Sequence, residues 1–233
     1  GLSMSGRRGV DTRVGWVAVL PCSVIARGSP REIVQYGHGV FDNRSEVTDS
    51  WLVALAQREE WALVATDWRG MSRFDLPVVA RAMLAQPETF RSTIDQLYQA
   101  FVDQFVLLRL APVMTQWLLT WVDSKKHSIP MDQDMSLTVG PAQSTDANVT
   151  FVGVSNGGIL GAGFVRWLDG LGGLRRAAII SAGSPFAGMV LTRSALFSLY
   201  QQALNLCFFD NASIQYFLYL LQLIWDPLDP SIW

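Results

Sequence analysis

The sequence predicts an α/β protein in which helices cover both faces of a mostly parallel sheet. Two observations lead to this prediction. Short apolar runs typical of strands buried on both faces occur at residues 61–66 (WALVAT) and 149–154 (VTFVGV). Longer segments with apolar residues at helical spacing lie between runs of this kind. Strands and helices that alternate along a chain form parallel sheets, because each helix carries the chain back to the start of the next strand.

The first half of the chain contains three expected strands and one helix. Residues 13–21 (RVGWVAVLP) and 32–36 (EIVQY) are rich in β-branched and aromatic side chains, which favours strands. Residues 46–60 have apolar side chains at helical spacing, and the apolar run at 61–66 follows directly. The polar, glycine-containing segment 67–70 is expected to be a loop.

Residues 76–148 are too long for an ordinary connection between two strands. Residues 76–122 are expected to be helical, in two or three helices broken near Pro87 and Pro112. Residues 123–148 are polar and are expected to form an irregular surface excursion. We therefore predict that 76–148 is a helical cap inserted above the carboxyl edge of the sheet, where α/β proteins bind ligands.

The second half repeats the alternation. A strand at 149–154 precedes a helix of small residues at 157–168, and a further strand is expected at 176–182. Residues 194–225 carry a single charge, Asp210, and their longest charge-free run is 16 residues. A spanning helix needs roughly 20 apolar residues, so we predict buried helices, or helices over a site for an apolar ligand, and no transmembrane segment.

The composition indicates one folded domain, residues 1–233. Half of the 233 residues are hydrophobic and the formal net charge is −2, which excludes a disordered chain and leaves enough length for a substantial core. No basic excess is present to neutralise phosphates, which argues against a nucleic-acid partner. The two cysteines, Cys22 and Cys207, fit no metal-ligand spacing, so we predict no metal site. One disulfide or two buried free thiols are both consistent with them.

The motif that carries chemistry is Gly153-Val154-Ser155-Asn156-Gly157, which fits the pattern G-x-S-x-G. A buried strand precedes it and a small-residue helix follows it. In this strand-to-helix context the pattern indicates a nucleophilic serine. The sharp turn from strand to helix strains the serine backbone, and the flanking glycines avoid clashes. The Ser155 hydroxyl is then expected at the top of the sheet, at a helix N-terminus that favours developing negative charge.

A second element, Tyr36-Gly37-His38-Gly39-Val40-Phe41, follows a strand directly. Its glycine-flanked turn can direct a backbone N–H group into the same site. With the N–H group of Asn156 it would form a two-donor oxyanion hole. Val40 is the predicted first donor, and Phe41 is the alternative.

These segments resemble the α/β-hydrolase superfamily, on its esterase and lipase side. The matching segments are YGHGV (36–40), WALVATDWRG (61–70), VTFVGVSNGG (149–158) and RAAIISAG (176–183). The resemblance implies an eight-stranded, mostly parallel sheet, a helical cap near the site, ester hydrolysis by Ser155, and no cofactor.

The resemblance breaks after the serine. In this superfamily an acid and then a histidine follow the serine along the chain. No histidine follows Ser155, because His38 and His127 both precede it. The resemblance implies that His38 supports its loop by hydrogen bonds, and His127 is expected to be a solvated loop residue. No strand pattern follows residue 182, so the last two strands of the fold are expected to be missing.

The remaining charged candidates are expected to be structural. Four acids follow the serine, namely Asp169, Asp210, Asp226 and Asp229. The last two lie between prolines in a turn-like end, where capping or turn roles are expected. Asp67 and Arg69 follow a strand and are expected to fix loops through an ion pair.

Two functional hypotheses remain. In the first, the chain is a serine hydrolase of carboxylic esters with an apolar acyl or alkyl group, and its base comes from a missing C-terminal segment or a partner chain that completes the sheet. In the second, the fold is a non-catalytic module that binds an apolar ligand or acts as a subunit of a larger assembly. A complete elbow with a strained serine favours the first hypothesis.

Overall fold

The computed structural model describes residues 14–84, 86, 89–125, 149–168 and 171–232. Five strands form one sheet in the order β1-β3-β2-β4-β5. The strands are β1 (Trp16–Val19), β2 (Glu32–Gly37), β3 (Trp61–Thr66), β4 (Val149–Val154) and β5 (Arg176–Ile180). β1 is antiparallel to β3, and the other neighbours are parallel. The predicted α/β class with a mostly parallel sheet is confirmed.

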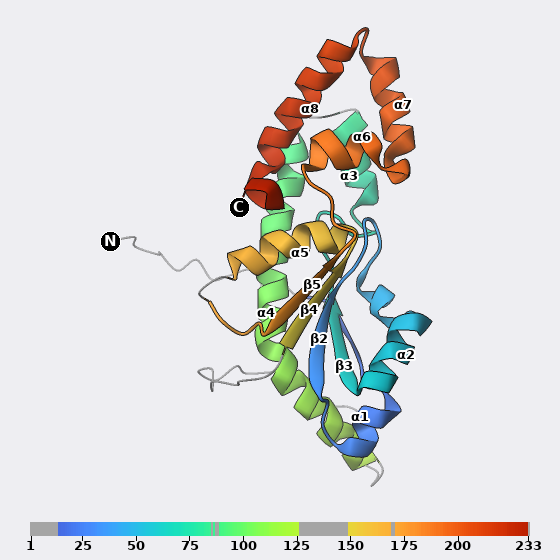
Figure 1. Cartoon of the computed structure of the whole chain (residues 1–233), viewed down its shortest axis with the longest axis vertical. Coiled ribbons are helices and arrows are strands. Elements are labelled where there is room, and N and C mark those ends of the chain that lie inside the picture. Colours follow the sequence, from blue (N-terminus) through green and yellow to red (C-terminus); the bar gives the residue numbers. More distant parts are fainter. Residues whose placement is uncertain (1–13, 85, 87–88, 126–148, 169–170, 233) are drawn as a thin grey trace, which may run out of the picture.

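Helices cover both faces of this sheet (Figure 1). α1 (Cys22–Arg27) and α2 (Ser50–Glu59), preceded by the 3₁₀ turn η1 (Arg44–Thr48), lie on one face. α4 (Phe90–Lys125) and α5 (Asn156–Trp167) lie on the other. The expected helix over 46–60 is therefore divided, because Asp49 has an extended backbone with φ −59° and ψ 139°.

The larger core lies between the sheet and α4 and α5. Trp68 is fully buried there, and its ring meets three others edge-on at centroid distances of 5.9 to 6.3 Å, those of Phe101, Phe151 and Phe164. Edge-to-face rings at these distances combine large buried area with favourable quadrupole contacts. A smaller cluster under α2 includes Val34, Tyr36, Leu52 and Leu63.

The prediction of a helix break near Pro112 was wrong, because α4 runs continuously through that residue for 36 residues. Proline removes only one backbone hydrogen bond, and neighbouring residues Leu108, Ala111 and Met114 are buried against the core. Tertiary packing of this kind offsets the local cost. By length and composition α4 could also cross a membrane, but a core helix passes the same test, and α4 packs on β2, β3 and β4.

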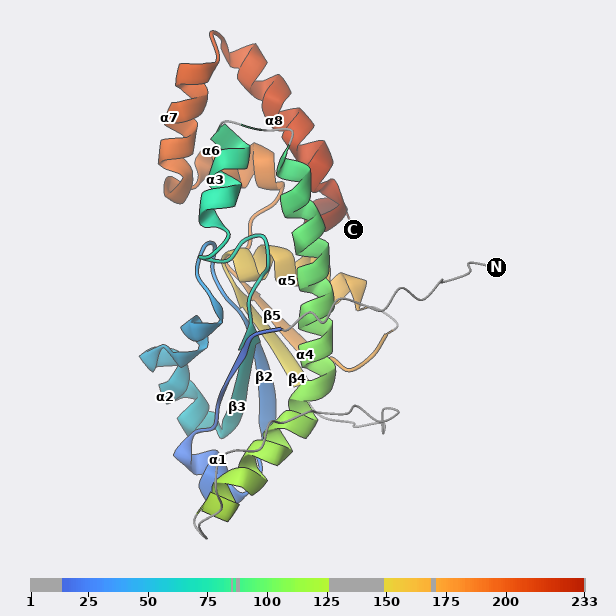
Figure 2. The same cartoon turned by 180° about the vertical axis from the view of Figure 1, so that it is seen from behind.

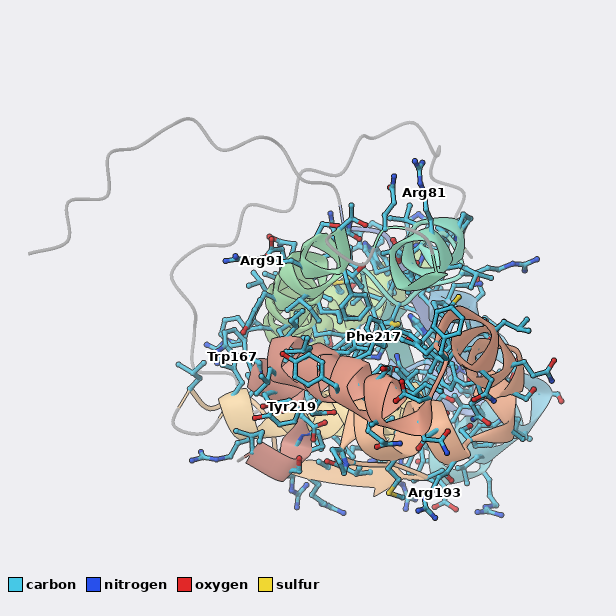
Figure 3. All side chains as sticks on the ribbon, turned by 90° about the horizontal axis from the view of Figure 1, so that it is seen from above. Arg81, Arg91, Trp167, Arg193, Phe217 and Tyr219 are labelled. Carbon is cyan, nitrogen blue, oxygen red and sulfur yellow. The ribbon has the colours of Figure 1, made fainter. Side chains whose placement is uncertain are left out.

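Several helices lie beyond the carboxyl ends of the strands (Figures 1 and 2). They are α3 (Leu76–Leu84), η3 (Phe186–Val190), α6 (Leu191–Arg193), η4 (Ala195–Phe197), α7 (Ser198–Cys207), α8 (Asn211–Trp225), η5 (Asp226–Leu228) and η6 (Pro230–Ile232). Figure 3 looks down on this end, with Phe217 and Tyr219 on α8. Of the predicted cap segment 76–148, α3 lies at this end, α4 starts there and continues along the sheet, and 126–148 lies outside the described residues.

The sheet ends at β5, where all five residues are exposed. No strand follows Ile180 in the described part of the chain, as the sequence predicted. Within the described residues the sheet therefore has five strands, compared with the eight that the resemblance implied. A parallel strand with an open edge leaves its backbone N–H and C=O groups unpaired, and apolar Ile179 and Ile180 are both exposed there.

The cysteines are both free and both exposed. Of the two expectations for them, the disulfide is excluded because Cys22 lies on α1 and Cys207 ends α7 at the opposite end of the molecule (Figure 1). The expected burial of the free thiols was wrong.

Candidate functional site

Ser155 connects β4 to α5 in a strained backbone conformation, with φ 55° and ψ −117°. A positive φ is costly for a residue with a Cβ atom and persists only when the surroundings enforce it. Here the Ser155 N–H group donates to the Ile180 carbonyl at 2.9 Å, and the Ser155 carbonyl accepts from Gly158 and Ile159. These bonds connect the turn to β5 and to the first turn of α5.

Two glycines of the motif are required by close backbone approach. A Cβ atom on Gly157 would lie 2.0 Å from the Gly37 carbonyl oxygen and 2.8 Å from that of His38. A Cβ atom on Gly153 would lie 2.0 Å from the Gly157 carbonyl oxygen. The start of α5 therefore touches the turn after β2, so the structure brings together the two motifs that the sequence singled out.

The two alternative oxyanion donors in the turn, Val40 and Phe41, differ in their hydrogen bonding. The N–H group of Phe41, which has φ 53°, donates to the Met71 carbonyl at 3.0 Å and is therefore engaged. Among the described residues, the N–H groups of Val40 and Asn156 have no acceptor within hydrogen-bonding distance. Of the two alternatives in the turn, Val40 is the one with a donor left for a ligand.

His38 is buried, and both of its ring nitrogens are engaged. Nε2 accepts from the Trp68 N–H group at 2.8 Å, and Nδ1 lies 2.7 Å from the Gly39 carbonyl oxygen. Since a carbonyl only accepts, Nδ1 carries the proton and the imidazole is neutral. Burial lowers the pKa of His38, which keeps it neutral. His38 thus connects the loops after β2 and β3 and has no nitrogen left to take a proton from Ser155.

Glu46 is a further residue of the loop that sequence reasoning did not single out. Its carboxylate accepts from the Tyr36 hydroxyl at 2.7 Å and from the Gly39 N–H group at 2.8 Å. Burial and the Glu46 carboxylate raise the pKa of Tyr36, so the phenol keeps its proton and donates it to this bond. The sequence placed Glu46 only at the start of a helix, and nothing in its local pattern pointed back to the turn.

The loop after β3 is held by two separate ion pairs. Asp67 pairs with Arg44 and accepts from its backbone N–H group at 2.7 Å. Arg69 pairs with Asp103 of α4 at 2.9 Å. The expectation that Asp67 and Arg69 fix loops is confirmed, although each does so with a partner from another element.

The three described acids that follow Ser155 accept hydrogen bonds from nearby backbone, hydroxyl or amide groups. Buried Asp229 accepts from the N–H groups of Phe186 (2.8 Å) and Ser231 (2.9 Å), and from the hydroxyl of Ser184. Asp210 caps α8 by accepting from the Ser213 N–H group at 2.8 Å. Asp226 accepts from Gln222 at 2.9 Å. The expected capping or turn role is confirmed for Asp229, whereas the Asp226 side chain bonds to a side-chain amide and caps no described helix. Asp169 and His127 lie outside the described residues.

The side chain of Asn156 is buried, and neither its Oδ1 nor its Nδ2 atom has a hydrogen-bond partner among the described residues. An unpaired buried amide is uncommon and costly, so a native structure normally supplies it with water, a ligand or a further group. This amide belongs to the residue next to Ser155. It is therefore a second unpaired polar feature of the elbow, beside the backbone N–H group of the same residue.

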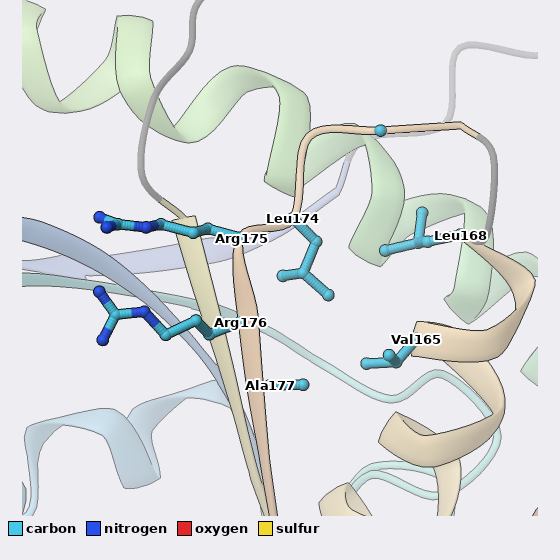
Figure 4. A pocket seen from close by; sticks show the side chains of 7 residues that line it. Val165, Leu168, Leu174, Arg175, Arg176 and Ala177 are labelled. Atoms are coloured by element: carbon cyan, nitrogen blue, oxygen red, sulfur yellow. The ribbon is translucent and has the colours of Figure 1, made fainter.

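A cavity of about 330 Å³ lies between α5 and the amino end of β5, which is the end of the strand away from Ser155. In Figure 4 the apolar side chains of Val165, Leu168 and Leu174 gather on one side, and those of Arg175 and Arg176 point the other way. β5 has 5 residues and is about 16 Å long, so this cavity is far from Ser155. No group of His, Cys, Asp or Glu side chains that could hold a metal occurs in the described part of the chain.

Fold and site together define an α/β protein with a strained serine between a parallel strand and a helix, beside a turn whose Val40 N–H group has no acceptor among the described residues. No protein-family model, curated protein or solved structure gives a significant match to this chain.

Proposed function

We propose that this protein is a serine hydrolase of carboxylic esters, with an α/β-hydrolase-like fold and Ser155 as the nucleophile. The observation that carries the proposal is the strained Ser155 turn in backbone contact with the loop that contains Val40. Backbone strain of this kind is concentrated at functional positions.

In the proposed reaction, the Ser155 hydroxyl oxygen attacks the ester carbonyl carbon, and a base takes the hydroxyl proton. The N–H groups of Val40 and Asn156 hold the oxyanion of the tetrahedral intermediate. Collapse of this intermediate expels the alcohol, which receives the proton, and leaves an acyl group on Ser155. Water then attacks the acyl carbonyl in the same way and releases the acid.

The base in this proposal comes from outside the described residues, because both nitrogens of His38 are engaged. The exposed edge of β5 offers a place for it. We infer that a further strand, from a C-terminal segment or a partner chain, pairs with β5 and brings an acid and a histidine to the carboxyl edge. The apolar helices at this edge favour an ester with an apolar acyl or alkyl group as substrate.

The alternative is a non-catalytic module that binds an apolar ligand or belongs to a larger assembly. The same engagement of His38 favours it, since a serine without a base is a poor nucleophile at neutral pH.

A fluorophosphonate probe distinguishes the two, because it labels only activated serines. We expect labelling of the natural full-length protein, and its loss in Ser155→Ala. Ser181 is a matched control, since it also follows a parallel strand and has a positive φ of 53°. Ser181→Ala should retain labelling. No labelling of the natural protein, or equal labelling of Ser155→Ala, would rule out the hydrolase and leave the binding module.

A further inference from the structure

The helices α7 and α8 form a hairpin that projects away from the sheet, with its tip at Phe208-Phe209-Asp210 (Figures 1 and 2). Phe209 is fully exposed at this tip, and Leu206, one turn earlier, is 88% exposed. Asp210 is the only charged residue between 194 and 225. Its carboxylate is occupied as the cap of α8. The tip is therefore an apolar projection with one exposed charge, the Asp210 carboxylate, whose pKa is lowered by hydrogen bonds from Ser213.

The outer face of α8 continues this apolar surface. Tyr216, Tyr219, Leu220 and Leu223 are all exposed, and their spacing places them on one side of the helix. Monomeric soluble proteins rarely expose connected apolar surface of this kind, and where they do it marks a contact with another protein or a membrane. We call Leu206, Phe209 and these four residues the hairpin surface.

The hairpin is firmly packed, so its exposure does not reflect a detached element. Trp225 at the base is fully buried, and its ring stacks on that of Phe186 with centroids 3.8 Å apart. Leu218 and Leu221 are buried on the inner face of α8. Near the tip, the rings of Phe208 and Phe217 lie 5.4 Å apart. The apolar tip is thus held outward by a rigid base.

Three arginines surround this end of the molecule. Arg81, Arg91 and Arg193 lie around its periphery in Figure 3. All three are exposed, and none has an ion-pair partner among the described residues. Arg193 lies near the start of α7, which has 10 residues and is therefore about 15 Å long, so this guanidinium is set back from the tip.

We propose that the hairpin surface docks on a phospholipid membrane, with the side chains of Leu206 and Phe209 in the apolar layer and the arginines at the headgroup phosphates. Amphipathic anchors penetrate about 5–10 Å, and Arg193, set back from the tip by the length of α7, has a long side chain that spans the remaining distance to the headgroups. Guanidinium groups bind phosphate in paired hydrogen bonds, and tyrosines favour the boundary between apolar and polar layers. The tip is narrow and projects from the rest of the molecule. A narrow projection can enter a fluid lipid layer directly, whereas a protein partner would need a groove of matching shape to receive it. This inference does not depend on the chemistry of Ser155.

The two free cysteines offer a direct test. Cys207 is exposed at the end of α7, and exposed Cys22 lies at the opposite end of the molecule. An environment-sensitive fluorophore is attached to Cys207 in a Cys22→Ser variant of the full chain, and to Cys22 in a Cys207→Ser variant. Vesicles of phosphatidylcholine with a minority of phosphatidylglycerol should shift the emission of the Cys207 label to the blue and leave the Cys22 label unchanged. Equal responses, or none, would overturn the proposal.

Vesicle flotation with substituted chains provides a second readout. Phe209→Ser should weaken the partition by about tenfold or more, from the loss of one inserted phenyl ring. Phe74→Ser is the matched control, because Phe74 is also strongly exposed but lies on the loop after β3; it should bind as the natural protein does. Replacement of the three arginines by glutamine should weaken binding and reduce its dependence on salt.

The alternative to a membrane is a second copy of this chain bound to the hairpin surface. Sedimentation of the protein without vesicles detects it, because a dimer through the hairpin surface is lost in Phe209→Ser. A dimer of this kind that shows no vesicle binding would contradict the membrane proposal.

Discussion

Gly157 and Gly37 are in backbone contact: a Cβ atom on Gly157 would lie 2.0 Å from the Gly37 carbonyl oxygen. This contact joins the first turn of α5 to the end of β2, and it positions the Ser155 turn against the loop that contains His38 and Val40. A methyl group cannot fit between two backbones at this distance without moving one of them.

Gly157→Ala should therefore lower the free energy of unfolding by at least about 3 kcal/mol, the upper range for overpacked sites. Chemical denaturation with a circular dichroism readout measures this. Gly188→Ala is the control, because a Cβ atom there meets only Pro185 Cγ at an ordinary 3.5 Å. A Gly157→Ala protein as stable as Gly188→Ala would mean that the contact between α5 and β2 is looser than described.

The strained backbone of Ser155 should lower the free energy of unfolding. Its φ of 55° is costly for any residue with a Cβ atom, so Ser155→Gly should be more stable than Ser155→Ala by about 1 kcal/mol. Both variants lack the hydroxyl and should be inert to the fluorophosphonate probe. Thermal unfolding of the pair isolates the backbone effect. If the alanine variant were the more stable of the two, the strain at this turn would be absent.

The buried, neutral imidazole of His38 should make stability depend on pH. Because burial lowers its pKa in the folded protein, the unfolded chain binds the proton more readily. Its contribution is thus complete above the unfolded pKa of about 6.5, and stability falls as the pH drops below that value towards the lower folded pKa. Denaturation curves between neutral and mildly acidic pH should show this fall.

The loss of stability at acidic pH should disappear in His38→Gln, which cannot titrate. It should persist in His127→Gln, which removes the only other histidine. Persistence of the full pH dependence in His38→Gln would show that another group causes it.

Asp229 should stabilise the connection between the end of the chain and η3. Burial alone would raise its pKa, but hydrogen bonds from Ser184, Ser231 and Phe186 outweigh burial and lower it. Its contribution is therefore present above the unfolded pKa of about 3.9 and is lost as the pH falls through the lower folded value.

Asp229→Asn should cost about 2 kcal/mol at neutral pH, because several donors lose a charged acceptor. Asp226→Asn is the comparison, since Asp226 accepts one bond from Gln222, and it should cost less. Equal losses of unfolding free energy in the two variants, measured by denaturant unfolding, would contradict the larger stabilising contribution expected for Asp229.

Local patterns predicted most strands closely. The apolar runs at Trp61–Thr66 and Val149–Val154 coincide with β3 and β4, since short runs of β-branched and apolar residues favour strands. The expected burial on both faces holds for β3, whereas residues of β4 are alternately buried and partly exposed. Pro112 is the counterexample. Its local effect on a helix is unfavourable, and packing of the surrounding turns against the sheet outweighs it.

The α/β class and the strand–serine–helix motif at Ser155 could be predicted from the amino-acid sequence, because both depend on patterns within a few residues. The folded structure was needed to show that the turn at Gly37 touches the start of α5 and that both ring nitrogens of His38 are engaged. It was also needed to show that Phe41 donates its N–H group to Met71, whereas Val40 has no acceptor among the described residues. These relationships join residues far apart in the chain, and their hydrogen-bond partners are known only when separate strands lie side by side in the sheet.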